Sequence, residues 1–170
     1  MSFVVRPMAQ ADLDAVLDLG MRTPGSPHWT RGNYFDLVHL PGVKLVAESG
    51  GPFFDPISNP ISGFAVATVA TIAPGQSIGD LETIVVDTHA RRQGIGAALL
   101  EAVIAWCREA RAQRLELEVR VSNAAAIALY ERFRFARDGR RPGYYRNPEE
   151  DALLMGLELD STAKTVEKNP

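Results

Sequence analysis

The sequence predicts an α/β domain in which about four helices flank a mixed, mostly antiparallel sheet of about seven strands. Two observations support this prediction. Short runs of β-branched and apolar residues recur along the chain, and segments with apolar residues at helical spacing separate several of them. In chain order the elements are strand, two helices and two strands, followed by strand, helix, strand, helix and two strands. Such a mixed order is typical of a sheet covered by helices.

The first half of the chain supplies three strands and two helices. In order, they are a strand at 3–6, a helix at 11–19, a helix at 30–40, a strand at 43–48 and a strand at 63–72. Thr30 is the expected cap of the second helix, because a hydroxyl can accept a hydrogen bond from a free N–H of the first turn. The long segment 49–62 contains three prolines, and we expect it to be a loop between antiparallel strands.

The second half supplies four strands and two helices. In order, they are a strand at 80–87, a long helix that begins near Gln93, a strand at 115–120, a helix at 124–133, a strand that begins at 135 and a closing strand at 152–159. The segment 139–151, GRRPGYYRNPEED, is expected to be a loop. Strict alternation in LELEVR places Glu116, Glu118 and Arg120 on one face of their strand and the apolar residues on the other.

The totals indicate one domain, residues 1–159, followed by a frayed tail at 160–170. The start lacks the layout of a secretory signal, and a single cysteine, Cys107, forms no internal disulfide, so we expect a cytoplasmic protein. Cys107 lies in the apolar run VIAWC, which favours a buried structural thiol over a catalytic one. No apolar run reaches the roughly 18 residues of a membrane span. No metal-ligand spacing is present.

Charge is unevenly distributed along the chain. The net charge is −3, which gives no general reason to expect nucleic-acid binding. Residues 91–146 contain twelve arginines against six acids, a net charge of +6 that leaves −9 on the rest. A basic part beside an acidic part favours one anionic and one cationic partner. The alternative is that most of these arginines simply solvate helix faces.

The segment RRQGIG, residues 91–96, stands between a predicted strand and a predicted helix. The first N–H groups of a helix have no intrahelical partner and lie at the positive end of its dipole. Glycines keep side chains away from an approaching phosphate, so the turn is a candidate site for a pyrophosphate. The alternative is a tight turn in which the glycines serve only geometry, because Gly-x-Gly alone is a weak signal.

Residues 80–135 resemble the acetyl-CoA core of the GNAT superfamily of N-acetyltransferases. RRQGIG matches the Arg/Gln-x-x-Gly-x-Gly/Ala signature of that family. LEVRVSNAAAIALYERFRF and GYYRNPEEDALLMGLEL resemble the RimI branch, the ribosomal-protein alanine N-acetyltransferases. The good match covers about residues 80–159, and the first half fits only loosely. The resemblance implies the GNAT fold and acetyl-CoA as co-substrate.

The resemblance also implies which residues bind acetyl-CoA. The backbone of Ile84, Val85 and Val86 would pair with the pantetheine arm like an added strand. The pyrophosphate would lie on the backbone of the helix start, and these residues are Gln93, Gly94, Ile95, Gly96, Ala97 and Ala98. Arg91 and Arg92 would add positive charge. Asn123 would contact the pantetheine arm, although capping the helix at 124–133 is an equally good role.

By the same resemblance, Glu118 is the expected general base and Tyr130 the general acid for the departing sulfur. Glu82 is a rival base, because other GNAT branches use a glutamate on that strand. Tyr144 and Tyr145 are expected to line the peptide channel. The alternatives are an exposed polar row for Glu118, a core position for Tyr130, and packing on the sheet for the two tyrosines.

Three functions follow from these expectations. The first is acetylation of a protein N-terminal amine of the ribosomal-protein alanine type. The second is a GNAT enzyme that acetylates a small amine such as an antibiotic, a polyamine or an amino acid. The third is a noncatalytic acetyl-CoA-binding module, which would have no need of Glu118 and Tyr130. The fold by itself does not identify the acceptor.

Overall fold

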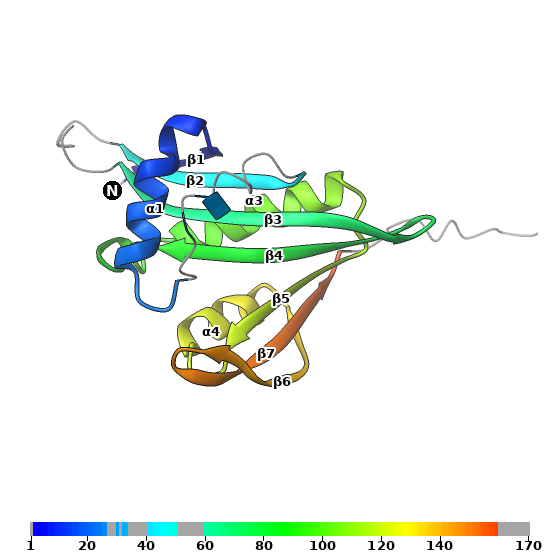
Figure 1. Ribbon diagram of the computed structural model, residues 1–170. Helices are drawn as coiled ribbons and strands as arrows, with labels where there is room; N and C mark the ends of the chain where they lie inside the picture. Colours follow the sequence, from blue (N-terminus) through cyan, green and yellow to red (C-terminus); the bar gives the residue numbers. More distant parts are fainter. Residues whose placement is uncertain (1, 27–29, 31, 34–40, 51–59, 160–170) are drawn as a thin grey trace, which may run out of the picture.

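The computed structural model describes residues 2–26, 30, 32–33, 41–50 and 60–159 (Figure 1). The strands are β1 (Ser2–Pro7), β2 (Val43–Gly50), β3 (Ile61–Ala73), β4 (Gln76–Val86), β5 (Arg114–Arg120), β6 (Ala136–Arg146) and β7 (Glu149–Glu158). The α-helices of the described residues are α1 (Leu13–Arg22), α3 (Ile95–Glu109) and α4 (Ala124–Arg132). Two short 3₁₀ turns, η1 (Gln10–Asp12) and η2 (Thr88–Ala90), precede α1 and the turn before α3.

The seven strands form one sheet in the order β1-β2-β3-β4-β5-β7-β6. The β4–β5 pair is parallel, and every other pair is antiparallel. This arrangement confirms the predicted fold class and the number of strands. The parallel pair is joined by α3, as expected for a crossover connection between parallel strands.

Helices cover the two faces of the sheet unequally. The first apolar cluster joins α3 and α4 to one face of β2–β5 and β7, and the second joins α1 to the other face of β2, β3 and β4. In β3, Phe64 and Val66 pack toward α1 while Ala65 and Ala67 pack toward α3. Burial on both faces explains why this strand is a continuous apolar run instead of an alternating one.

α3 lies unusually close to β3 at Gly63. A Cβ atom added there would lie 2.9 Å from Cγ2 of Ile95 and 2.9 Å from the carbonyl oxygen of Val85. Both distances are shorter than a normal contact, so a side chain at this position would displace the helix or the strand. Ile95 is the first residue of α3, and Gly63 therefore fixes the height of that helix end above the sheet.

Two predicted segments of the first half lie mainly outside the described residues. Thr30 accepts a hydrogen bond at its Oγ1 from the backbone N–H of Asn33 (3.3 Å), which is the capping contact expected for the helix predicted at 30–40. Residues 34–40 of that helix, residues 51–59 of the predicted loop and the predicted tail at 160–170 are outside the described part.

The predicted loop 139–151 is wrong, because β6 continues to Arg146 and β7 begins at Glu149. β6 is an edge strand of the sheet and is mostly exposed, so its arginines, Pro142 and Gly143 do not show the apolar alternation of a strand. A register shift between Arg141 and Tyr145 accommodates the proline and the glycine.

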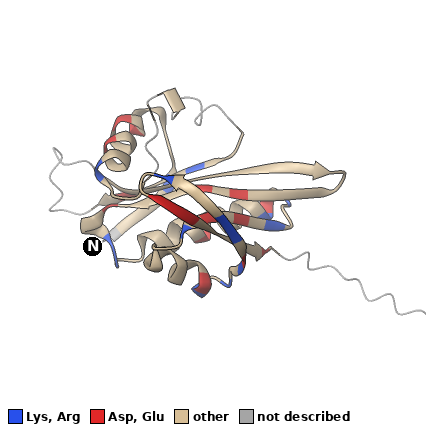
Figure 2. Ribbon diagram, turned by 60° about the horizontal axis from the view of Figure 1, so that its bottom comes forward, with Lys and Arg blue, Asp and Glu red and all other residues tan. Residues whose placement is uncertain are grey.

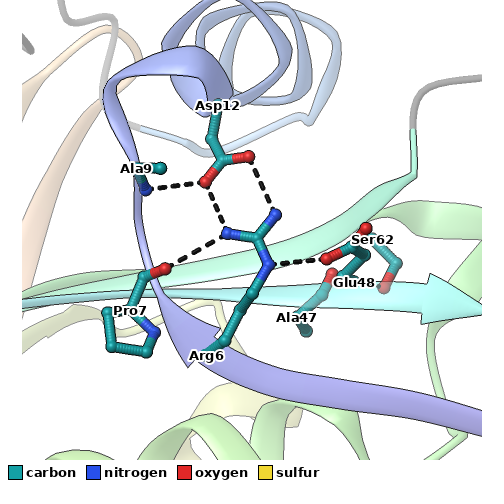
Figure 3. Close-up of polar contacts among 7 residues, drawn as sticks. All are labelled: Arg6, Pro7, Ala9, Asp12, Ala47, Glu48 and Ser62. Carbon is teal, nitrogen blue, oxygen red and sulfur yellow. Dashed lines mark hydrogen bonds and ion pairs between the residues drawn. The ribbon is translucent and has the colours of Figure 1, made fainter.

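An ion-pair cluster fixes the start of the chain to the sheet (Figure 3). Arg6 on β1 donates two hydrogen bonds to the carboxylate of Asp12, at 2.7 and 2.9 Å, and one to Glu48 on β2, at 2.5 Å. Asp12 also accepts the N–H of Ala9 at 2.7 Å. The cluster therefore joins β1, β2 and the turn that leads into α1.

Replacing Asp12 by asparagine is expected to lower the free energy of unfolding by about 1–3 kcal/mol at neutral pH. Hydrogen bonds from Arg6 lower the pKa of Asp12, despite the opposing effect of burial. A lowered pKa stabilises the folded state above the ordinary value of about 3.9, and this stabilisation disappears as the pH falls through the folded-state value. Thermal melts of the two proteins should therefore converge in acid.

The matched control is Asp18→Asn, which removes an exposed carboxylate that pairs with Arg22 at 3.1 Å within α1. Such pairs contribute about 0.5 kcal/mol or less. A loss from Asp12→Asn no larger than that of Asp18→Asn would contradict the structural role of the cluster.

Candidate active site

The predicted phosphate turn connects the end of β4 to the start of α3. Asp87 follows β4 and is buried, and its carboxylate accepts the N–H of His89 (2.8 Å) and pairs with Arg22 at the end of α1 (2.5 Å). Its own N–H donates to the carbonyl of Ser62 (2.9 Å). Burial alone would raise the pKa of Asp87, but the bonds from His89 and Arg22 lower it. The base of the turn is thus held to α1 and β3.

Free backbone N–H groups line the end of this turn. Gly94 caps α3 with a left-handed conformation, φ 86°. The first intrahelical bond runs from the N–H of Ala98 to the carbonyl of Gly94 (3.0 Å), so the N–H groups of residues 94–97 precede it. Gly96 packs beside α4, where an added Cβ would lie 3.4 Å from the side chain of Leu129. Arg91 and Arg92 are exposed at the same turn.

The sheet opens beside these amides. β4 and β5 are paired only from Ile78 to Asp80 and from Arg114 to Glu116, and beyond these residues the two strands diverge (Figure 1). The edge of β4 from Glu82 to Val86 therefore faces no strand on its β5 side. This edge contains the predicted residues Ile84, Val85 and Val86. Unpaired backbone groups on a strand edge are ready to pair with an extended ligand, and the carbonyl of Val86 accepts a hydrogen bond from Nε of Arg91 at 3.4 Å.

Glu82 lies at a β-bulge on this edge. Val66 pairs with Thr83 and Ala67 pairs with Leu81, so Glu82 is the extra residue of β4. Its carboxylate accepts a hydrogen bond from Oγ1 of Thr68 at 3.3 Å. The rival base is therefore placed on the β4 wall of the opening.

Glu118 lies on the opposite wall, on β5. Leu117 and Val119 are buried, so the alternation predicted for this strand is confirmed. The Glu118 carboxylate pairs with Arg141 of β6 at 2.5 Å. Its hydrogen bond with the hydroxyl of Tyr144, together with burial, raises the pKa of that tyrosine to about 12. Arg141 also lies over the Tyr144 ring, 5.0 Å from the centroid.

Tyr130 on α4 and Tyr145 on β6 lie near each other beside β5. Tyr130 on α4 is buried, with its ring centroid 5.6 Å from that of Phe135. Its hydroxyl has no hydrogen-bond partner among the described residues. Burial raises the pKa of Tyr130, and the nearby Tyr145 raises it further, so the phenol stays protonated. Tyr145 on β6 donates to the backbone carbonyl of Glu118 at 3.4 Å.

Acidic side chains gather beside the opening between β4 and β5. Asp80 is raised to a pKa of about 6, first by burial and then by the charges of Glu82, Glu118 and Glu116. Asp80 itself lies at an exposed position of β4. The four carboxyl groups create a negative potential that favours a cation.

Asn123 caps α4 in the structure. Its side-chain oxygen accepts the N–H of Ala126 at 3.2 Å, which confirms the capping alternative and leaves the amide nitrogen available to a ligand. Cys107 is buried, and burial raises the pKa of its thiol to about 11, as expected for a structural residue. Among the described residues, no three His, Cys, Asp or Glu side chains are grouped as metal ligands, and no helix is long and apolar enough to span a membrane.

The structure thus brings the predicted site residues to one opening of the sheet, but sequence reasoning missed several neighbours. Arg141 and Arg120 contact the predicted residues Glu118 and Tyr145 directly, and Glu150 contacts Arg120. No local pattern marks them, since Arg120 and Glu150 are 30 positions apart and Arg141 lies in a segment expected to be a loop. The tyrosines belong to an edge strand and are held by these charged side chains.

Comparison with known proteins identifies the family. The sequence profile of the acetyltransferase (GNAT) family matches residues 16–135. A Bacillus subtilis (strain 168) protein, provisionally named a ribosomal protein bS18-alanine N-acetyltransferase, is 30% identical over 158 residues, which is 92% of this chain and 95% of that protein. An N-alpha-acetyltransferase of Saccharolobus solfataricus is 32% identical over 168 residues, covering 92% of this chain and 93% of the relative.

A third relative is similar over a shorter stretch of the chain. The ribosomal protein bS18-alanine N-acetyltransferase of Escherichia coli K12 is 46% identical over 81 residues, which is 46% of this chain and 55% of that enzyme.

Solved structures agree with these relationships. The ribosomal-protein-S18-alanine N-acetyltransferase from Escherichia coli superimposes with a TM-score of 0.78 and 28% identity, over 97% of this chain and 99% of that one. The NatC complex bound to Gag peptide and CoA contains a chain with a TM-score of 0.82 and 23% identity, covering 94% and 100%, which shows a shared fold. Because the family profile matches residues 16–135 and a relative is 30% identical over 92% of the chain, this chain belongs to the GNAT family of acetyltransferases.

Proposed function

We propose that this GNAT enzyme acetylates the N-terminal α-amine of a protein, as ribosomal-protein alanine N-acetyltransferases do. Acetyl-CoA is the acetyl donor of the family. The main support is the opening between β4 and β5, which has free amides at one end and Glu118, Tyr130 and two further tyrosines around it. Relatives named for acetylation of an N-terminal amine add to this support.

The donor end of the site suits a diphosphate. The free N–H groups of residues 94–97 and the positive end of the α3 dipole favour an anion at this turn. Arg91 and Arg92 add two positive charges at exposed positions. From there the pantetheine arm runs along the free edge of β4 at 84–86, and the amide nitrogen of Asn123 is placed at the start of α4 to donate to it.

The acceptor end suits an ammonium group. The carboxyl groups of Asp80, Glu82 and Glu118 lie near one another beside the opening, and their mutual repulsion is what a bound cation relieves. Arg141 pairs with Glu118 but is about half exposed, so an arriving amine can replace it at low cost. Tyr144 and Tyr145 are available to contact the peptide that follows the amine.

The chemistry requires one proton acceptor and one proton donor. An N-terminal amine has a pKa of about 7.7–8.0, so much of it is protonated at neutral pH. Glu118 accepts that proton, directly or through water, and the amine then bonds to the acetyl carbon. As the carbon–sulfur bond breaks, Tyr130 gives its phenolic proton to the sulfur, and the second proton that the nitrogen loses passes through water to restore the phenol. Burial keeps Tyr130 protonated until that step, and its hydroxyl has no competing partner among the described residues.

Acceptor choice is tested by thiol release from acetyl-CoA with a panel of amines. Peptides that begin Ala-Arg or Ser-Arg are expected to be acetylated with a kcat/KM at least about tenfold above that of free amines. The same peptides with a blocked N-terminus but an intact lysine serve as the control and should remain unmodified. Turnover on free amines alone would refute the proposal.

The diphosphate site is tested by Gly94→Ala. Gly94 and Gly75 both have positive φ, 86° and 73°, and an added Cβ meets nothing within 4 Å at either position. Each substitution should cost about 1–2 kcal/mol of stability. Calorimetry should show weaker acetyl-CoA binding for Gly94→Ala only, since its methyl group occupies the anion's approach. Equal affinity in the two variants would argue against binding at this turn.

The assignment of acid and base is tested by three substitutions. Glu118→Gln and Tyr130→Phe are each expected to lower kcat by about 10²–10⁴-fold while acetyl-CoA affinity is retained. Glu82→Gln is the matched comparison, because Glu82 lies on the other wall and accepts a hydrogen bond from the hydroxyl of Thr68. A larger loss of kcat in Glu82→Gln than in Glu118→Gln would transfer the base role to Glu82.

A further inference from the structure

Arg120, the last residue of β5, contacts the β6–β7 hairpin, which carries the proposed acceptor-binding residues Tyr144 and Tyr145. Its Nη1 donates to Glu150 (3.1 Å) and to the carbonyl of Pro148 (3.2 Å), and its Nη2 donates to the carbonyl of Asn147 (3.2 Å). Its guanidinium carbon lies 4.1 Å from the ring centroid of Tyr145. One side chain therefore holds both the turn of the β6–β7 hairpin and an active-site tyrosine.

Glu150 links Arg120 to the start of α4, on the side of the site where acetyl-CoA is proposed to bind. The carboxylate oxygen not bonded to Arg120 accepts the N–H of Ser122 at 2.6 Å. The bond from Ser122 is the first cause of the lowered pKa of Glu150, and Arg120 adds to it. Ser122 directly precedes Asn123, the cap of α4, and α4 carries Tyr130. The chain of contacts thus runs from Tyr145 through Arg120 and Glu150 to the helix that holds the proposed acid.

The next residue of β7 holds the other side of the hairpin. Adjacent residues of a strand point to opposite faces, and Asp151 accepts the N–H of Gly143 at 3.0 Å. Gly143 directly precedes Tyr144. The Glu150–Asp151 dipeptide therefore fixes the backbone on both sides of the two tyrosines, once through Arg120 and once directly.

We propose that Arg120 and Glu150 are positioning residues that set the acceptor-binding tyrosines relative to the donor-binding helix. This inference rests on the proposed function, because it assigns Tyr145 to the acceptor side. The pair is well placed for the role: the side chains of Arg120 and Glu150 are only 18% and 15% exposed, so solvent screens them little. Misplacement of reacting groups by about 1 Å can cost about 100-fold in rate, so such a brace affects turnover without touching substrate.

Arginine is specifically required by this geometry. Its planar group donates to two carbonyls and a carboxylate while its face covers the Tyr145 ring. A lysine keeps the charge and can pair with Glu150, but a single ammonium does not make all of these contacts together. Arg120→Lys is therefore a conservative test of position.

The test compares Arg120→Lys with Arg114→Lys. Arg114 begins the same strand and also joins β5, β6 and β7, through ion pairs with Glu116, Asp138 and Glu158. It lies at the opposite end of the strand from the site. Both variants should lose thermal stability to a similar extent, so the matched pair separates positioning from general stabilisation.

For Arg120→Lys we expect the acceptor KM to rise about tenfold or more and kcat to fall, with acetyl-CoA affinity within about twofold of the wild type. Arg114→Lys should leave both KM values unchanged. Glu150→Gln, which keeps an acceptor for the Ser122 N–H but loses the charge, should show the same pattern as Arg120→Lys in weaker form. An unchanged acceptor KM in Arg120→Lys and Glu150→Gln would overturn the inference.

A double-mutant cycle with Tyr145→Leu tests whether Arg120 acts through that ring. If it does, Arg120→Lys adds little to the acceptor KM once the ring is removed, whereas additive effects would overturn the inference. The measurements use whichever amine the wild-type enzyme acetylates in the panel. Failure of peptide acetylation by the wild type therefore rejects the proposed function, and failure of Arg120→Lys to alter acceptor KM rejects only this inference.

Discussion

β4 and β5 are hydrogen-bonded only over Ile78–Asp80 and Arg114–Glu116, and this early separation organises the molecule. A strand edge without a partner carries polar groups that cost about 1–3 kcal/mol each when they are buried unpaired. α3 follows β4 and α4 follows β5, so both helices begin beside the gap. The carboxyl ends of adjacent parallel strands and the positive ends of two helices meet there, an arrangement that favours an anionic, extended ligand.

The two faces of the sheet differ in chemical character at the site. The face under α3 and α4 is apolar and closely packed, and it holds Tyr130 in a place where its phenol does not ionise. The other face of β5–β7 has no described helix over it, and acidic and basic residues are interleaved along its strands (Figure 2). Arg114 and Arg120 brace this half at the two ends of β5, each through contacts with the strands beside it. An apolar packed layer thus supports a layer of charged side chains that form ion pairs with one another.

The sequence predicted those parts of the site that depend on local pattern. Gly94 at a helix start, the alternation around Glu118 and the capping side chain of Asn123 each follow from contacts within a few residues. The hairpin that carries Tyr144 and Tyr145 was not predictable in this way, because an exposed edge strand has no apolar face to reveal it. The bulge at Glu82 also left no local signal, since it is defined by the partner strand.

Long-range ion pairs account for the remaining differences. In the sequence, Arg120 looks like one more charged residue of an exposed row. Its partner Glu150 lies on β7, a strand that was predicted to begin two residues later, at 152. The pattern of a strand shows which face a side chain occupies, whereas the identity of its partner depends on how distant strands align. The strand order and register are therefore needed before such ion pairs can be predicted.

The missing side chain at Gly63 has a consequence for the donor substrate. Because β3 offers only a hydrogen where α3 begins, the first turn of the helix lies against the backbone of the sheet, and a Cβ atom at Gly63 would displace it. In the proposed complex, this close packing would hold the amides of the turn near the exposed edge of β4, along which the pantetheine arm would extend. The position of the thioester would then depend on a residue beneath the helix that never meets the ligand.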